Sequence, residues 1–122
     1  MVGVEPTSCN TLQAGRAAGS PVTSTPSGLA ADSLGASSAG ALVFPIAQAY
    51  VSEVVLVDDE DIRKTQRHLR NALQLVTEPG GAAAFAALLS SAYKPQANER
   101  VGVIVCSANT PLDVFNRLLD TV

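Results

Sequence analysis

Short continuous apolar runs alternate along this chain with longer stretches in which apolar residues recur every three or four positions. Three such runs, at residues 2–4, 53–57 and 101–105, are rich in valine and are followed by polar or turn-forming residues. This pattern is typical of strands that are buried on both faces of a parallel sheet. The run at 101–105 is the clearest of the three. Because the first strand begins at residue 2, we expect that further chain normally precedes it.

The first half of the chain predicts two helices and a long loop. Residues 11–18 form a short helix, which Gly19 and the nearby Pro21 end. Residues 19–40 are rich in Gly, Ser, Thr and Pro and predict a loop with one helical turn near residues 30–34. A loop of this length inside a domain is either functional or disordered. The apolar residues 41–51 predict the second helix.

The second half predicts three more helices. Residues 58–73 form an amphipathic helix with Asp58 as its N-terminal cap. Its apolar face comprises Ile62, Leu69 and Leu73. Pro79 opens the next helix, which is nearly all small and apolar and extends to about residue 92. The last helix starts at Pro111 and runs to about residue 122.

The order of these elements is strand, helix, strand, helix, helix, strand, helix. It predicts an α/β fold with a mostly parallel sheet, because parallel strands need crossover connections. A length of 122 residues suffices for a single domain, residues 1–122. The apolar share of 47% can form a core, and it consists mainly of alanine, valine and leucine rather than aromatic residues.

Charge and composition exclude several classes of function. The net charge is −3 and no basic cluster is present, which argues against a nucleic-acid partner. The longest apolar block, residues 82–89, is far shorter than the ~20 residues that a membrane span needs. The first residues lack a basic secretion signal, and Cys9 and Cys106 fit no metal-binding spacing. We therefore expect a cytoplasmic protein without a membrane or nucleic-acid partner.

Polar turns follow three of the predicted extended segments. They are Glu5 with Pro6, residues 77–81, and residues 106–110. Open parallel sheets bind ligands beyond the carboxyl ends of their strands, so these turns are the candidate ligand contacts. By itself this placement does not specify a ligand.

Longer motifs make the interpretation specific. Residues 28–35 read Gly-Leu-Ala-Ala-Asp-Ser-Leu-Gly, residues 57–63 read Val-Asp-Asp-Glu-Asp-Ile-Arg, residues 78–83 read Glu-Pro-Gly-Gly-Ala-Ala, and residues 103–110 read Val-Ile-Val-Cys-Ser-Ala-Asn-Thr. Together with Val-Glu-Pro at 4–6 and Phe-Pro-Ile at 44–46, their order resembles the threonine/serine dehydratase family. These are pyridoxal-phosphate (PLP) enzymes of fold type II, similar to the tryptophan synthase β chain. The resemblance implies that the chain is the last third of a member's length and part of its large domain.

The resemblance also implies the cofactor and its contacts. PLP is the expected cofactor, with Cys106 against its ring nitrogen, Ser107 beside it and Glu78 nearby. A neutral thiol does not hold that nitrogen protonated as a carboxylate does, which favours elimination over transamination. From the residues alone, Cys106 can equally be a buried structural cysteine. Glu78 can likewise be an acid that the N-terminus of a helix stabilises.

Four other polar residues each allow a functional and a purely structural interpretation. Glu5 matches a glutamate that helps bind a cation in some relatives, but Thr11 stands where an accompanying aspartate is expected. Asp32 and Ser33 lie in a stretch that approaches the family's active site, or they simply form a loop turn. His68, between arginines on the polar side of its helix, is interpreted as a solvated histidine.

The chain departs from the family in ways that bear on activity. The lysine that binds the cofactor lies in a Ser-Phe-Lys motif in the family, and neither Lys64 nor Lys94 has that context. The glycine-rich phosphate loop is also absent, and Ser107 with Ala108 replaces a Gly-Gly pair. We therefore predict no catalytic residue in this chain and no activity of the chain alone.

Three functions remain open. The chain is a fragment of a lyase that converts hydroxy amino acids to 2-oxo acids and ammonia, with a small amino acid as substrate of the parent enzyme. Alternatively, it is a degenerate, non-enzymatic relative or a complementing subunit. It can also derive from a racemase or hydroxyaspartate dehydratase of the same fold. An uncovered sheet edge is expected to promote self-association.

Overall fold

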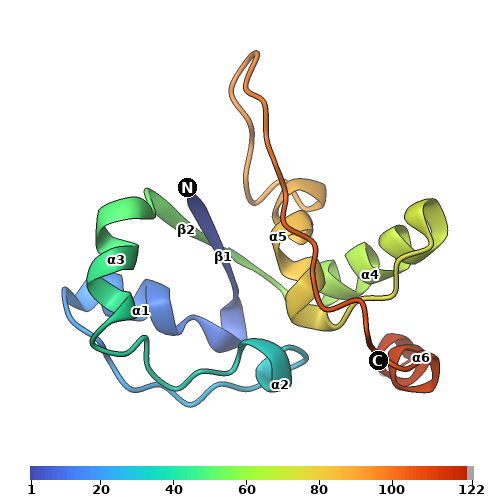
Figure 1. Ribbon diagram of the computed structural model, residues 1–122, viewed down its shortest axis with the longest axis horizontal. Coiled ribbons are helices and arrows are strands. Elements are labelled where there is room, and N and C mark those ends of the chain that lie inside the picture. The colour runs from blue at the N-terminus through green and yellow to red at the C-terminus, as the bar shows by residue number, and fades with distance from the viewer. Residues whose placement is uncertain (121–122) are drawn as a thin grey trace.

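The computed structural model describes residues 1–120 and contains a small parallel sheet with helices packed around it (Figure 1). Strand β1 (Val2–Pro6) pairs with β2 (Glu53–Val57), and Val4 lies opposite Val55 in the register. The order β1-β2 with a helical crossover between the two strands confirms the predicted α/β class with a parallel sheet.

The crossover between the strands contains short helical elements. They are η1 (Thr7–Cys9), α1 (Thr11–Ala18), α2 (Ala31–Leu34) and α3 (Val43–Tyr50). Helix α1 ends at Gly19, whose φ of 74° is a left-handed conformation that glycine adopts without strain. The predicted loop at 19–40 runs around the outside of these elements and includes α2. It is tied down where Ser27 donates its backbone N–H to the Ser8 carbonyl oxygen, at 3.0 Å.

The second half consists of three helices, α4 (Asp59–Leu73), α5 (Pro79–Leu89) and α6 (Leu112–Asp120). Helix α5 packs against α4 and against both strands, so its small residues form the centre of the core. Ala82, Ala83, Ala86 and Ala87 are all buried there. They meet Ile62 and Leu69 of α4, which are fully buried as their spacing predicted.

The prediction of a third strand at residues 101–105 is wrong. Residues 101–105 are extended but belong to neither strand of the sheet, and no described residue pairs with their backbone. Ile104 is 80% exposed. An apolar run becomes a strand only when a neighbour accepts and donates its ladder hydrogen bonds, and this run lacks one.

The ends of two helices also differ from the sequence prediction. Asp58 occupies the N-cap position of α4 without a side-chain cap, because its carboxylate instead accepts a 2.7 Å hydrogen bond from the Thr7 hydroxyl. Helix α5 stops at Leu89 rather than near residue 92, since Ser91 turns left-handed at φ 62° and the Tyr93 N–H returns to the Ala87 carbonyl at 2.9 Å. Leu73, predicted on the apolar face of α4, is 60% exposed in its last turn.

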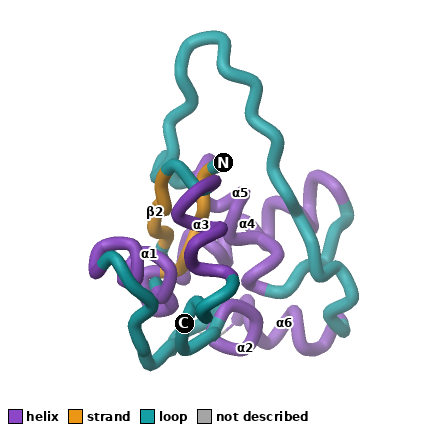
Figure 2. The backbone as a smooth tube through the Cα atoms, turned by 60° about the vertical axis from the view of Figure 1, so that its left-hand side comes forward, coloured by secondary structure: helices purple, strands orange, loops and turns teal. Residues whose placement is uncertain are grey.

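Residues 94–100 form an arm that projects away from the rest of the molecule (Figure 2). At its base the Tyr93 hydroxyl donates a 2.7 Å hydrogen bond to the Glu99 carboxylate, which also accepts the Gln96 N–H at 2.7 Å. Among residues 1–120, no helix is both long and apolar enough to cross a membrane.

Candidate functional site

The turn that opens α5 and the turn after the extended segment lie against each other, although 25 or more residues separate them. The Glu78 N–H donates to the Ser107 carbonyl oxygen at 3.1 Å. Gly81 lies directly beneath the Cys106 carbonyl, and a Cβ at Gly81 would overlap that oxygen. The two candidate turns, predicted separately from the sequence, are therefore one structural unit.

Helix α2 brings a third candidate segment to the same place. The Ser33 hydroxyl accepts the Gly80 N–H at 3.0 Å, one of the N-terminal amides of α5. Gly80 allows this approach, because a Cβ there would come within 2.8 Å of the Ser33 oxygen. The stretch at residues 32–33 thus contacts the Glu78 turn through a specific hydrogen bond.

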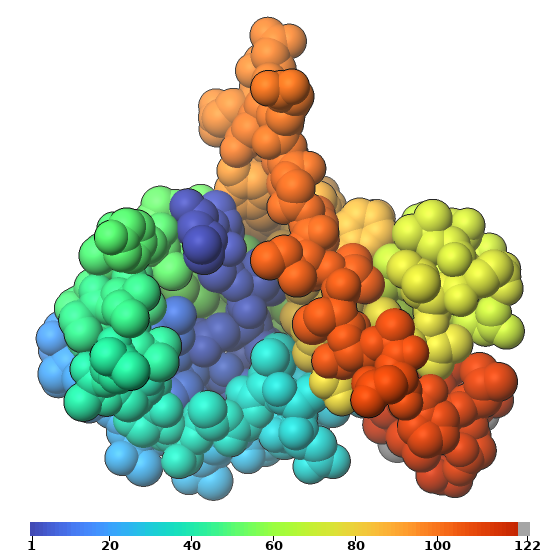
Figure 3. Space-filling model, viewed as in Figure 1, coloured from blue at the N-terminus to red at the C-terminus, as the bar shows by residue number. Residues whose placement is uncertain are grey.

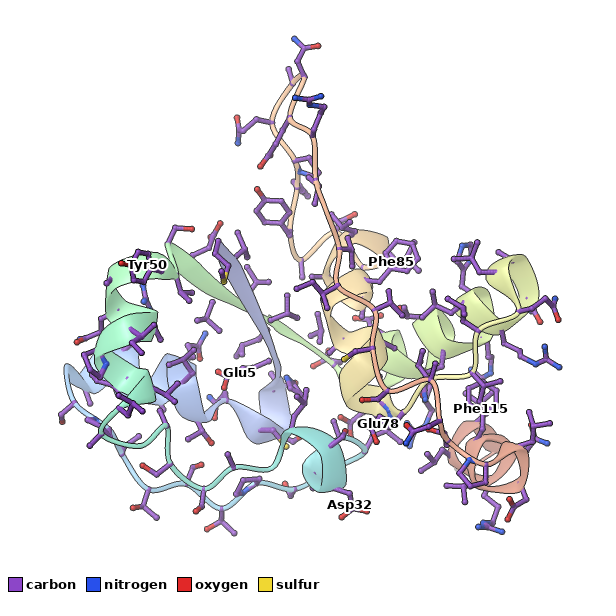
Figure 4. All side chains as sticks on the ribbon, in the orientation of Figure 1. Glu5, Asp32, Tyr50, Glu78, Phe85 and Phe115 are labelled. Carbon is purple, nitrogen blue, oxygen red and sulfur yellow. The ribbon has the colours of Figure 1, made fainter. Side chains whose placement is uncertain are left out.

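These segments enclose a pocket of about 300 Å³. Its lining consists of Leu29, Asp32, Ser33, Glu78, Pro79, Asn109, Thr110, Pro111, Val114 and Leu118. Figure 4 shows Asp32 and Glu78 on this side of the molecule, whereas Glu5 lies apart from them near α1. The pocket combines two carboxylates, which can accept hydrogen bonds from a cationic group such as an ammonium, with amide and hydroxyl groups.

Cys106 and Ser107 lie beside this pocket rather than in its lining. The Cys106 thiol is free and exposed, so it is not the buried structural cysteine that the sequence also allowed. Ser107 has φ 54°, a left-handed conformation that is uncommon for serine. Its hydroxyl lies 3.9 Å from the Cys106 sulfur. The structure therefore presents a thiol and a hydroxyl at the end of the extended segment.

Glu5 has a different environment. Both of its carboxylate oxygens accept backbone hydrogen bonds, from the N–H of Leu12 at 2.8 Å and of Gln13 at 2.9 Å. These amides belong to the first turn of α1, so Glu5 caps that helix from the end of β1. The described residues include no cluster of three or more acidic, His or Cys side chains suited to a metal. A metal-binding role for Glu5 stays a prediction.

Neither lysine lies at the pocket. Lys64 is an exposed residue of α4 whose ammonium lies 4.0 Å from the Asp61 carboxylate. Lys94 lies beyond the end of α5, at the start of the arm, and does not line the pocket. His68 is exposed and packs edge-on against Phe85, with ring centroids 5.9 Å apart. Among the described residues, therefore, no lysine side chain lines the pocket.

The sequence analysis did not identify three residues that contribute to this region. Val114 and Leu118 of α6 line the pocket, and their i, i+4 spacing was the available signal. Asp59, in the first turn of α4, accepts the Leu29 N–H at 2.8 Å and so holds the loop before α2. No local pattern in the sequence indicates that loop contact.

Comparison with known proteins identifies the class. The family model described as "Pyridoxal-phosphate dependent enzyme" matches residues 1–107. The chain belongs to this family of PLP-dependent enzymes, which confirms the resemblance and the cofactor that the sequence motifs implied.

Individual relatives narrow the comparison. The chain is 34% identical over 119 residues to a phenylserine dehydratase of Ralstonia pickettii, a match covering 98% of this chain and 36% of the relative. It is 30% identical over 121 residues to an L-threo-3-hydroxyaspartate ammonia-lyase of Pseudomonas sp., covering 98% and 37%. This chain thus spans about a third of the length of these relatives.

Solved structures agree with the fold. A serine racemase of maize superposes with a TM-score of 0.79 at 27% identity, covering 95% of this chain and 37% of the racemase. A threonine deaminase of Solanum lycopersicum gives a TM-score of 0.82 at 23% identity, covering 98% and 36%. The described segments therefore hold the arrangement that they have inside larger domains of fold type II.

Proposed function

We propose that this chain forms the wall on the ring-nitrogen side of the cofactor in a PLP-dependent lyase of dehydratase type. We further propose that the chain alone catalyses no reaction. The observation that carries the proposal is the joining of the Glu78 and Ser107 turns beside an exposed Cys106 thiol. The ammonia-lyase and dehydratase relatives support elimination as the parent chemistry.

Each candidate residue has a distinct part in this proposal. Bound PLP supplies an electron-withdrawing ring that stabilises negative charge on a substrate's α-carbon. With the cofactor bound, the Cys106 thiol would hold the ring nitrogen without protonating it, and the Ser107 hydroxyl, which lies beside the thiol, would be a further contact. Glu78 carries a carboxylate that makes no hydrogen bond with the described residues, so it is free to accept a proton or an ammonium group from a ligand.

A small β-hydroxy amino acid is the proposed substrate of the complete enzyme. The pocket suits its size, and the amide of Asn109 and the hydroxyl of Thr110 in its lining offer hydrogen bonds to a polar ligand. A racemase is the second candidate, because serine racemases of Dictyostelium discoideum and Oryza sativa are 27% and 29% identical to this chain.

Titration of the purified chain with PLP tests whether it acts alone. We expect no absorbance band of lysine-bound cofactor, because neither Lys64 nor Lys94 lines the pocket. Borohydride treatment followed by peptide mass spectrometry should find no stoichiometric label on Lys64 or Lys94. The variants Lys64→Arg and Lys94→Arg control for non-specific surface labelling. A saturable, stoichiometric label that one of these variants abolishes would contradict the proposal.

A further inference from the structure

The peptide unit that joins Thr77 to Glu78 is held from both of its sides. Its carbonyl oxygen accepts a 2.8 Å hydrogen bond from the side-chain Nε2 of Gln66, a residue of α4. Its N–H donates to the Ser107 carbonyl oxygen at 3.1 Å. A trans peptide unit is planar, and its C=O and N–H point in opposite directions. The two hydrogen bonds together therefore fix the orientation of the whole plane.

The orientation of this plane sets the direction in which the Glu78 side chain leaves the backbone. The Glu78 nitrogen is one end of the plane, and with φ at −69° the positions of its Cα and Cβ follow from the position of the plane. Glu78 lines the pocket of about 300 Å³. The hydrogen bond from Gln66 thus bears on a group in the pocket, although Gln66 does not line the pocket itself.

Gln66 is a costly residue to bury. Its side chain is fully buried, and its amide oxygen Oε1 has no hydrogen-bond partner among residues 1–120. One hydrogen bond returns less free energy than an unsatisfied buried amide oxygen costs. An unbranched apolar side chain such as methionine fills a similar space without any polar atom to satisfy. Stability therefore does not account for an amide at this position, whereas control of the peptide between Thr77 and Glu78 does.

A contact from α2 leaves the Glu78 carboxylate free. Glu78 occupies the N-cap position of α5, where a side-chain oxygen commonly accepts a backbone N–H of the first turn. Here the Ser33 hydroxyl accepts the Gly80 N–H at 3.0 Å, and Glu78 makes no side-chain cap. Figure 3 shows the cyan residues of α2 near the yellow residues at the start of α5 and the red-orange residues that follow Cys106. The backbone of Glu78 is held while its side chain stays available to the pocket.

We propose that Gln66 is a positioning residue, which orients the peptide before Glu78 and thereby places the Glu78 carboxylate in the pocket. We call the pair of hydrogen bonds on this peptide, from Gln66 and to Ser107, the peptide clamp. Gln66 acts through the backbone of Glu78 and does not touch a ligand. The use of Glu78 toward a ligand rests on the function proposed above, whereas the peptide clamp does not.

Hydrogen exchange in the unmodified full chain tests whether the peptide clamp exists. In isotope-labelled chain without cofactor, the side-chain amide hydrogens of Gln66 should exchange slower than those of the exposed Gln48 and Gln96 by about tenfold or more, the effect of one buried hydrogen bond. Equal exchange of the three side-chain amides would overturn the proposal.

The variant Gln66→Met tests what the peptide clamp does. We expect the Glu78 N–H to exchange about tenfold faster, because its peptide has lost one of its two hydrogen bonds. The Ala86 N–H, in the middle of α5, should keep its rate, since a positioning role affects local opening only. Acceleration of both amides by the same factor would show a purely structural role and overturn the proposal, as would an unchanged rate at Glu78.

Thr77→Val is the matched control for this substitution. It removes the buried Thr77 hydroxyl, which has no partner among the described residues, and keeps the carbonyl that accepts from Gln66. The Glu78 N–H should therefore keep its exchange rate within about twofold. An acceleration equal to that of Gln66→Met would assign the effect to packing around residue 77 and overturn the proposal. All these rates are measured without PLP, so failure of the peptide clamp and failure of the proposed function are observed separately.

Discussion

Gly81 determines how closely the two ligand-facing turns approach. It is buried in the first turn of α5, directly beneath the carbonyl of Cys106. Close helix packing of this kind depends on the missing Cβ and needs no unusual backbone angle. The position of Cys106 relative to Glu78 thus depends on a residue that has no side chain.

We predict that Gly81→Ala lowers the free energy of unfolding by about 1–3 kcal/mol, the usual cost of overpacking a buried site. The added methyl group can be accommodated only if the Cys106 loop moves away. Urea denaturation of both proteins measures the loss, and increased reactivity of Cys106 toward a thiol reagent reports the displaced loop.

Gly102→Ala is the matched control for this substitution. A Cβ at Gly102 has no atom within 4 Å, so its free energy of unfolding should stay within about 0.5 kcal/mol of the original chain. Equal effects of the two substitutions would show that Gly81 does not fix the loop.

Residue-level prediction from the sequence succeeded where a contact is set by a motif. The turns at 77–81 and 106–110 were both predicted as turns that follow extended segments, and the Glu78–Ser107 hydrogen bond joins them; their contact with a ligand stays a prediction. Prediction from the sequence failed where a side chain accepts hydrogen bonds from the backbone of a different element. Glu5 caps α1, and Asp59 holds the Leu29 amide, because the fold brings those groups together without any local pattern.

At the scale of elements, the base of the arm joins two titratable groups, Tyr93 and Glu99, in one contact. The hydrogen bond that the Tyr93 phenol donates to Glu99 raises the pKa of Tyr93 above 10.0. The same hydrogen bond lowers the pKa of the Glu99 carboxyl below 4.5, and a hydrogen bond from the Gln96 N–H contributes to this lowering. Both shifts arise from the same contact, in which Glu99 is ionised and Tyr93 is protonated.

We predict that this contact orders the base of the arm between about pH 4.5 and pH 10. Since the pKa of Glu99 is lowered in the folded chain, the stability that the ionised Glu99 adds to the base of the arm is lost as pH falls through that lowered value. Since the pKa of Tyr93 is raised, the stability that the protonated phenol adds is lost as pH rises through that raised value. In a Tyr50→Phe background the ultraviolet titration of the one remaining tyrosine measures the second change.

Glu99→Gln should lower the pKa of Tyr93 toward 10.0, because it weakens the hydrogen bond that the phenol donates to a charged acceptor and also removes the negative charge that opposes phenolate formation. Asp113→Asn, at a charged residue of α6 outside the arm, is the control and should leave that titration unchanged. An unaltered Tyr93 pKa in Glu99→Gln would contradict the assigned contact.

Periodicity predicted most elements because their stabilising partners are near in sequence or in the core. Helices α1, α3 and α4 lie within a few residues of their predicted bounds, and Pro79 begins α5. The strand at 101–105 failed for a different reason. Its apolar pattern is that of a strand, but strand structure is a property of pairs, and the described chain provides no partner.

For the whole molecule, open edges and exposed apolar side chains should promote association. Both outer edges of the sheet are unpaired, and Leu42, Ile46 and Tyr50 of the α3 region are more than half exposed. We predict that the apparent mass in size-exclusion chromatography rises with concentration through the sheet edge. A monomer at every concentration would contradict this prediction.

The variant Ile46→Lys distinguishes association through the sheet edges from association through the exposed apolar residues of α3. It places a charge on the exposed side of α3 and leaves both edges of the sheet intact. Association that persists in this variant agrees with the edge as its cause. Association that disappears would assign it to α3 and contradict the edge.

The projecting arm has a consequence for the integrity of the chain. Arg100 lies on the exposed arm, where trypsin can reach the backbone, whereas Arg63 donates to the Leu118 carbonyl of α6 at 3.2 Å. Cleavage after Arg100 would separate a piece that carries Cys106, Ser107 and α6. That piece would remain attached through the Glu78 turn, Gly81 and the arginines of α4. The arm is therefore a natural point at which this molecule could be made from two polypeptides.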